Sequence, residues 1–97
     1  GEEIELAGQT IRCILTPGHT CGGMSYYLPK AGILFSGDTL FEESVGRTDF
    51  PTGSTSTLIR SIREKLFVLP DAVRVYPGHG MMTSIENEKK FNPFAVE

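Results

Sequence analysis

The stretch "ILFSGD", residues 33–38, joins a short apolar run to a glycine and an aspartate. The run 33–35 is typical of a strand that is buried on both faces, and the polar residues that follow end it. The end of a buried strand is where α/β proteins usually place their binding and catalytic sites. Asp38 is therefore the first candidate for a functional residue.

Two other loops repeat this pattern of a strand, a glycine and a polar side chain. The β-rich segment 10–15 runs into "TPGHT", and a second apolar segment runs into "PGHG", so that His19 and His79 each follow a glycine, as Asp38 does. Taken singly, each of the three is as well explained as a turn or capping residue. If their strands are neighbours in one sheet, the strand ends converge, and two imidazoles with a carboxylate suit Zn²⁺, Fe or Mn²⁺.

The remaining pattern indicates an α/β architecture. An apolar stripe at helical spacing predicts a helix over 54–66. The sequence T-S-I-E fits a capping box in which Thr83 caps a second, short helix that ends near Asn92. Residues 39–53 are expected as a long loop. The order strand, strand, strand, helix, strand, helix favours helices on one face of a mainly antiparallel or mixed sheet, with strands over 10–15, 24–28, 33–35 and 72–76.

The bulk properties narrow the class of protein. The chain has 97 residues and a formal net charge of -3, which argues against a nucleic-acid binder with a basic patch. No apolar run approaches the roughly 18 residues of a membrane span, and no signal peptide is visible. The two cysteines, Cys13 and Cys21, favour reduced thiols. We therefore expect a cytoplasmic protein with neither nucleic-acid nor membrane partners.

Four segments, taken together, resemble the metallo-β-lactamase-fold hydrolases, and most of all their glyoxalase II-like branch, the hydroxyacylglutathione hydrolases and their bacterial relatives. The resemblance runs from about Ile4 to Phe94. It implies the second αβ half of an αββα sandwich, with a mainly antiparallel or mixed sheet and helices on one face. The segments, in order, are "TPGHT" (16–20), "FSGDTLF" (35–41), "VGRTDFP" (45–51) and "YPGHG" with "TSIENEKKFNPF" (76–80 and 83–94).

The resemblance also implies a metal centre. In it, His19 completes the first metal site, Asp38 bridges two metals and His79 is the final ligand of the second. Two divalent ions, zinc or else iron or manganese, would activate a hydroxide that attacks a thioester such as an S-acylglutathione. Thr16 and Thr20 would orient His19, with ordinary turn hydroxyls as the alternative.

Further candidates lie outside the implied ligand set. Arg47 and Asp49, in "GRTD", are expected to pair and brace the loop beside the site. Lys89 and Lys90 are weak candidates for contacts with the substrate, or else ordinary surface lysines. No residue of this chain is assigned as the catalytic acid or base.

The sequence departs from the family in one respect, because its H-x-H-x-D-H signature is absent. We therefore interpret residues 1–97 as a single unit, the C-terminal half of such a domain. Alone, this fragment is expected to bind metal weakly or not at all and to lack useful thioesterase activity. Two alternatives stay open for the parent protein: a mononuclear iron persulfide dioxygenase of the same fold, and a non-catalytic interaction module with relic ligands.

Half a sandwich leaves one face of its sheet without a partner sheet. The apolar area exposed there would exceed the few hundred Å² that soluble monomers tolerate. We therefore expect the isolated chain to form a homodimer, for which two-fold symmetry is the simplest closed arrangement. The residues expected on this face are Ile11, Ile14, Ile33, Phe35, Val73 and Val75.

Overall fold

The computed structural model describes residues 3–6, 8–18, 23–42, 44–46, 53–78 and 80–94. Its main sheet has six strands in the order β1-β2-β3-β4-β7-β8. Every neighbouring pair is antiparallel except β4 and β7, which are parallel. The expected mixed, mainly antiparallel sheet is confirmed. Its strands are β1 (Glu3–Leu6), β2 (Gln9–Leu15), β3 (Met24–Leu28), β4 (Ile33–Gly37), β7 (Arg74–Pro77) and β8 (Thr83–Ser84).

A second, two-stranded sheet occupies part of the expected long loop. Strands β5 (Leu40–Phe41) and β6 (Ser44–Val45) pair as an antiparallel hairpin. The expectation of a loop throughout 39–53 is therefore wrong in its first part. Leu40 is fully buried, so packing against the core holds this hairpin, and strands of two residues are too short for a periodic pattern to reveal.

The predicted helix over 54–66 is present, in two parts. Helix α1 (Thr55–Ser61) runs directly into η1 (Ile62–Leu66), which has π-helical hydrogen bonding. Ser54 caps the start, since its hydroxyl accepts the Thr57 N–H at 3.3 Å. Among the described residues, no helix is long and apolar enough to cross a membrane.

The second helix, α2 (Ile85–Phe91), ends where the sequence predicts, but the predicted cap is wrong by one residue. Ser84 is the N-cap, and its hydroxyl accepts the Asn87 N–H at 3.1 Å. Thr83 instead donates its hydroxyl hydrogen to the buried carboxylate of Glu88 at 2.6 Å. Both residues are competent caps, but the hydroxyl of Thr83 is already bonded to Glu88.

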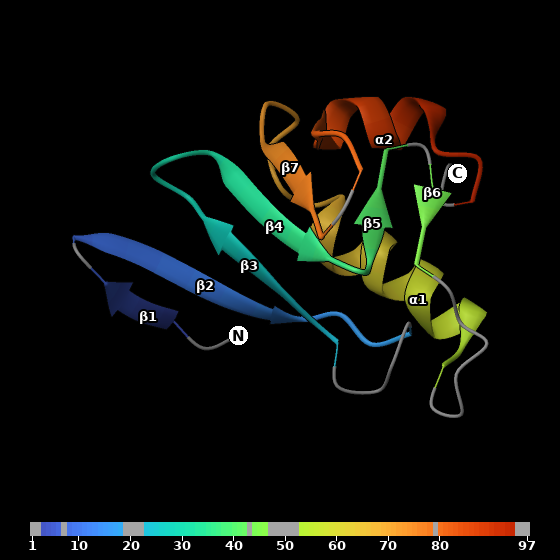
Figure 1. Cartoon of the computed structure of the whole chain (residues 1–97), viewed down its shortest axis with the longest axis horizontal. Helices are drawn as coiled ribbons and strands as arrows, with labels where there is room; N and C mark the ends of the chain where they lie inside the picture. Colours follow the sequence, from blue (N-terminus) through green and yellow to red (C-terminus); the bar gives the residue numbers. More distant parts are fainter. Residues whose placement is uncertain are drawn as a thin grey trace.

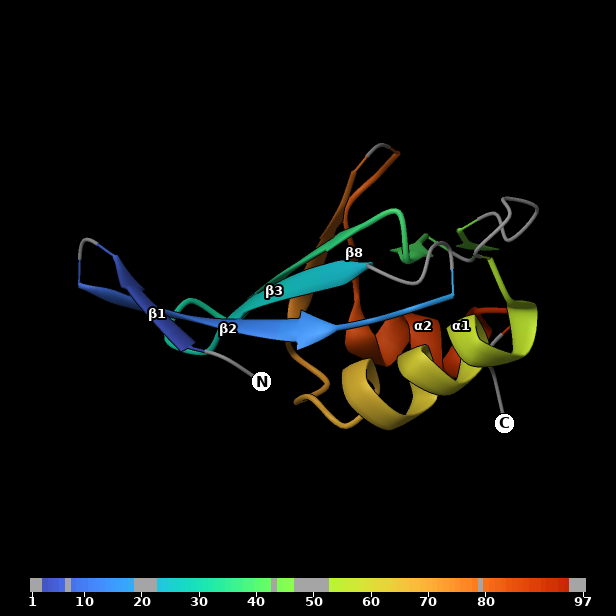
Figure 2. The same cartoon turned by 90° about the horizontal axis from the view of Figure 1, so that it is seen from below.

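Both helices pack on the same face of the sheet (Figure 2), as expected. The core lies between them and the sheet, and burial of its apolar side chains stabilises the fold by roughly 25 cal/mol per Å². Its buried members are Tyr27, Leu34, Leu40, Leu58, Ile62, Leu66, Leu69, Val73, Val75 and Ile85.

The opposite face of the sheet, called the open face below, carries exposed apolar side chains. Cys13, Tyr26, Phe35 and Tyr76 are register partners across four adjacent strands, so their side chains share a face. Tyr26 and Phe35 are 43% and 45% exposed, whereas Cys13 is a buried free thiol. By alternation along β1, β2 and β3, the same face also carries Ile4, Leu15 and Met24, all exposed.

Two expectations about these strands need correction. The segment 33–35 is buried on one face only, since Phe35 is half exposed. Of the six residues expected on the uncovered face, Ile11, Ile33 and Phe35 lie there. The other three belong to the helix-covered side, because neighbouring strand positions point to opposite faces; they are Ile14, Val73 and Val75.

Candidate metal centre

The carboxyl ends of β2, β4 and β7 lie at the same edge of the main sheet. Strands β4 and β7 are parallel, and β2 points the same way because β3 is antiparallel to both β2 and β4 (Figure 1). The three strands thus belong to one sheet and end at one edge, but only β4 and β7 are neighbours, because β3 lies between β2 and β4. His19 and His79 themselves lie outside the described residues.

Asp38 lies in the turn after β4, against the end of β7. The Gly78 N–H donates to the Gly37 carbonyl at 2.8 Å. A β-carbon at Gly78 would lie 3.3 Å from Oδ1 of Asp38 and 3.2 Å from the Gly37 carbonyl oxygen. Glycine at position 78 therefore allows a close approach that a side chain would crowd. The residue before His79 is thus bonded to the Gly37 carbonyl, directly before the predicted bridging carboxylate.

The loop after β2 is fixed against the helix by its backbone carbonyls. The carbonyl of the last β2 residue and two carbonyls of the loop each accept a hydrogen bond from α1, its cap or η1, so the backbone leading to His19 is held in one conformation. The bonds are Lys65 Nζ to Leu15 at 2.8 Å, Ser61 Oγ to Pro17 at 2.8 Å, and the Ser54 N–H to Gly18 at 2.7 Å.

Gly18 makes the closest of these approaches. Its φ is +138°, and a β-carbon there would lie 2.2 Å from Cα and 2.4 Å from the backbone nitrogen of Leu58. Only glycine combines this backbone conformation with that proximity. The loop that precedes His19 is therefore seated directly on helix α1.

Three buried hydroxyls connect this loop to the turn that carries Asp38. Oγ1 of Thr16 shares one hydrogen bond with Oγ of Ser25, at 3.0 Å, and another with Oγ1 of Thr39, at 3.1 Å. Thr16 is a residue that the family resemblance places near His19, whereas Ser25 and Thr39 were given no role from the sequence. A serine early in a strand and a threonine after an aspartate are both common, so only the fold reveals that they meet.

Gly46 also lies at the Asp38 turn. Its N–H donates to the Thr39 carbonyl at 3.1 Å. Arg47, Asp49 and Thr20 lie outside the described residues, so the predicted ion pair and the role of Thr20 stay predictions.

The two candidate substrate lysines, both on α2, form ion pairs. Lys89 Nζ lies 2.9 Å from Oδ1 of Asp71, and Lys90 Nζ lies 3.3 Å from Oε2 of Glu86. All four side chains are well exposed, and such pairs contribute little to stability. The substrate contacts suggested for Lys89 and Lys90 stay a prediction.

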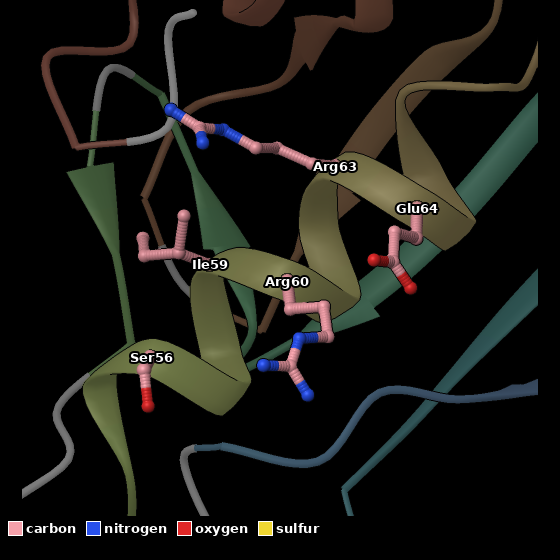
Figure 3. A pocket seen from close by; sticks show the side chains of 5 residues that line it. All are labelled: Ser56, Ile59, Arg60, Arg63 and Glu64. Carbon is pink, nitrogen blue, oxygen red and sulfur yellow. The ribbon is translucent and has the colours of Figure 1, made fainter.

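The surface of α1 and η1 carries a pocket (Figure 3). Figure 3 shows its two guanidinium groups pointing in different directions, so they do not converge on one anion. Its lining comes entirely from this helical segment: Ser56, Ile59, Arg60, Arg63 and Glu64.

The donor chemistry at the strand ends fits a divalent ion. Among the residues that the structure describes, no three His, Cys, Asp or Glu side chains are grouped to hold a metal. The predicted ligands comprise Asp38 and two histidines outside those residues, so the set stays a prediction. Two imidazoles and one carboxylate are ligands that zinc, iron and manganese all accept.

The sequence matches the metallo-beta-lactamase superfamily over residues 1–79. It is 47% identical over 90 residues to a probable metallo-hydrolase of Streptococcus pyogenes, covering 93% of this chain and 39% of that protein. It is 44% identical over 94 residues to hydroxyacylglutathione hydrolase GloC of Haemophilus influenzae, covering 97% and 44%. The chain thus spans less than half the length of these relatives.

Solved structures agree along nearly the whole chain. The BLEG-1 B3 metallo-beta-lactamase has a TM-score of 0.94 and 40% identity, over 100% of this chain and 46% of that chain. ETHE1 from Myxococcus xanthus has a TM-score of 0.92 and 40% identity, over 99% and 44%. TTHA1623 in a di-iron-bound form has a TM-score of 0.85 and 39% identity, over 97% and 46%. With this fold, this arrangement of strand ends and these relatives, the chain belongs to the metallo-β-lactamase superfamily.

Proposed function

We propose that the whole protein containing this chain is a metal-dependent hydrolase of thioesters such as S-acylglutathione. The observation that carries the proposal is the hydrogen bond from the Gly78 N–H to the Gly37 carbonyl, which brings the chain leading to His79 to the Asp38 turn. The similarity to hydroxyacylglutathione hydrolase GloC supports the thioester class.

His19, Asp38 and His79 would hold the metal in this proposal, with further ligands from sequence outside this chain. A divalent ion supplies a hydroxide at neutral pH and polarises the substrate carbonyl. The role of this chain is to fix the directions from which its ligands approach, through the seated loop after β2 and the tight Asp38 turn. TTHA1623, similar in structure, was solved in a di-iron-bound form, which supports two ions, with zinc, iron and manganese as candidates.

A second candidate function is a mononuclear iron dioxygenase that acts on persulfides. The 40% identity to ETHE1 from Myxococcus xanthus supports this candidate. The two candidates differ in their metal content and in their need for oxygen, so both can be tested on one preparation.

The first test measures metal content and turnover of the purified whole protein. A hydrolase is expected to contain two ions per chain, to release thiol from S-lactoylglutathione, and to lose this activity when a chelator removes the metal. One iron per chain, with oxygen consumed on addition of glutathione persulfide and no thioester hydrolysis, would establish the dioxygenase instead. Metal-free protein that is inactive on both substrates would favour a non-catalytic module.

A second test targets the contact between β7 and the Asp38 turn. In Gly78→Ala, the added carbon lies 3.2–3.3 Å from the Gly37 carbonyl and the Asp38 carboxylate, so the carboxylate must shift. We expect metal affinity to fall about tenfold, as when partners that orient a ligand are lost, while the thermal midpoint changes little.

The matched control for this test is Gly32→Ala. Gly32 has φ +66° with nothing within 4 Å of an added carbon, so alanine there strains the backbone by about 1–2 kcal/mol without touching the site. It should lower stability and leave metal affinity unchanged. If Gly78→Ala keeps the parent affinity, the contact does not position Asp38.

A further inference from the structure

We propose that the hydroxyl chain Ser25–Thr16–Thr39 is a positioning device that fixes the loop before His19 relative to Asp38. This inference rests on the proposed metal-dependent function and names residues that would prepare the site before the metal binds. None of the three side chains is a proposed ligand.

The sheet topology explains why such a device is needed. Strands β2 and β4 carry the two ligand-bearing ends, but β3 lies between them. The backbone ladders therefore connect β2 to β4 only through β3. The hydrogen bond between Thr16 and Thr39, at 3.1 Å and 23 residues apart in sequence, supplies a direct connection across the width of β3.

The two threonines that form this bond are both close in sequence to proposed ligands. Thr39 directly follows Asp38, and Thr16 stands three residues before His19. Thr39 is also fixed through its backbone, since its N–H donates to the Ser36 carbonyl at 3.0 Å and its carbonyl accepts from Gly46 at 3.1 Å. Movement of Thr39 would therefore displace the Asp38 turn as a unit.

Burial makes the hydroxyl chain selective for one arrangement. Thr16 and Ser25 are fully buried and Thr39 is 2% exposed, so water does not replace a lost bond. A hydroxyl can donate one hydrogen bond while accepting another, so the central Thr16 serves both partners. In surroundings of low polarity the hydrogen bonds of such a chain are stronger, and a hydroxyl left without its partner costs more free energy.

The composition of the helix-covered face supports a role beyond packing. In the middle of the sheet, this face carries apolar core residues such as Leu34 and Val75. Buried polar side chains replace them at the strand-end edge, where Ser36 also donates to the Leu40 carbonyl at 2.7 Å across the Asp38 turn. If filling space were the only requirement, valine and alanine would suffice at these positions.

The test is the zinc affinity of the whole protein, measured by competition with a chromophoric chelator. Thr39→Val keeps the shape of the side chain and removes the hydroxyl, so affinity is expected to fall about tenfold or more. Thr39→Ser restores the hydroxyl and is expected to recover most of the affinity. His79→Ala removes a proposed ligand, so a loss of zinc affinity in this variant shows that the measured zinc is bound at this site.

A matched control separates positioning from general loss of stability. Thr83→Val also removes a buried threonine hydroxyl, one that bonds to Glu88 on α2 instead of to the Asp38 turn. With thermal midpoints of the metal-free proteins measured in parallel, Thr83→Val should lower the midpoint and leave zinc affinity unchanged.

Each outcome then has one meaning. Equal zinc affinity in Thr39→Val and the parent, or an equal loss in Thr83→Val, overturns the positioning role and leaves the metal site standing. No zinc binding by the parent protein overturns the proposed function and this inference together. Loss in Thr39→Val, recovery in Thr39→Ser and no change in Thr83→Val support it.

Discussion

Gly18→Ala is expected to abolish cooperative folding. The added carbon would lie 2.2 Å from Cα of Leu58 and 2.4 Å from its nitrogen. Both are backbone atoms of helix α1, so no side-chain rotation relieves the clash, and the φ of +138° adds strain. We expect a loss above about 4 kcal/mol, at the extreme of single substitutions and comparable with the whole stability of a small domain.

Circular dichroism during thermal unfolding measures this effect. Gly8→Ala is the control, because Gly8 also has a positive φ, +78°, but nothing within 4 Å of an added carbon. It should unfold cooperatively at a modestly lower temperature. A folded Gly18→Ala with a midpoint near that of Gly8→Ala would show that the loop is not seated on α1 as described.

The isolated chain is expected to associate through its open face. Tyr26 and Phe35 lie side by side on adjacent strands, each more than 40% exposed, and Ile4, Leu15 and Met24 extend the apolar surface across β1, β2 and β3. An apolar patch of this kind is characteristic of an interface. A two-fold dimer is the simplest assembly that buries it.

Sedimentation at micromolar concentration tests this expectation. The isolated chain should sediment as a dimer and the double variant Tyr26→Lys, Phe35→Lys as a monomer, because two charges would oppose burial of the face. Val68→Lys is the control, since Val68 is 70% exposed and follows η1 outside the sheet. A monomeric parent chain, or a dimeric double variant, would contradict the proposal.

The regular elements were predictable because they depend on local patterns. Leu58, Ile62 and Leu66 recur at helical spacing, and all three are fully buried. A glycine precedes Asp38 and each of the two histidines, and these three glycines marked the strand ends. The three strands indeed end at one edge of the sheet. This much follows from periodicity and from the backbone freedom of glycine.

Features set by tertiary contacts were not predictable. The β5–β6 hairpin depends on burial of Leu40. The choice of Ser84 over Thr83 as the cap accompanies the bond between the Thr83 hydroxyl and the buried Glu88. Where apolar residues are adjacent in a short strand, the pattern does not show which of them faces the helices. Ile14 was assigned to the wrong face for this reason. The hydrogen bond between Thr16 and Thr39 joins residues that only the strand order brings together.

The parallel pair β4–β7 has a consequence for the order of folding. Every other strand pair of the main sheet joins neighbours along the chain, whereas β4 and β7 are separated by the β5–β6 hairpin and helix α1. Closing so long a loop costs more entropy than forming a hairpin, so this pairing is expected late. Since Asp38 and Gly78 meet at its end, the site is assembled only when the rest of the fold is in place. Nascent or partly folded chains would then lack a competent site.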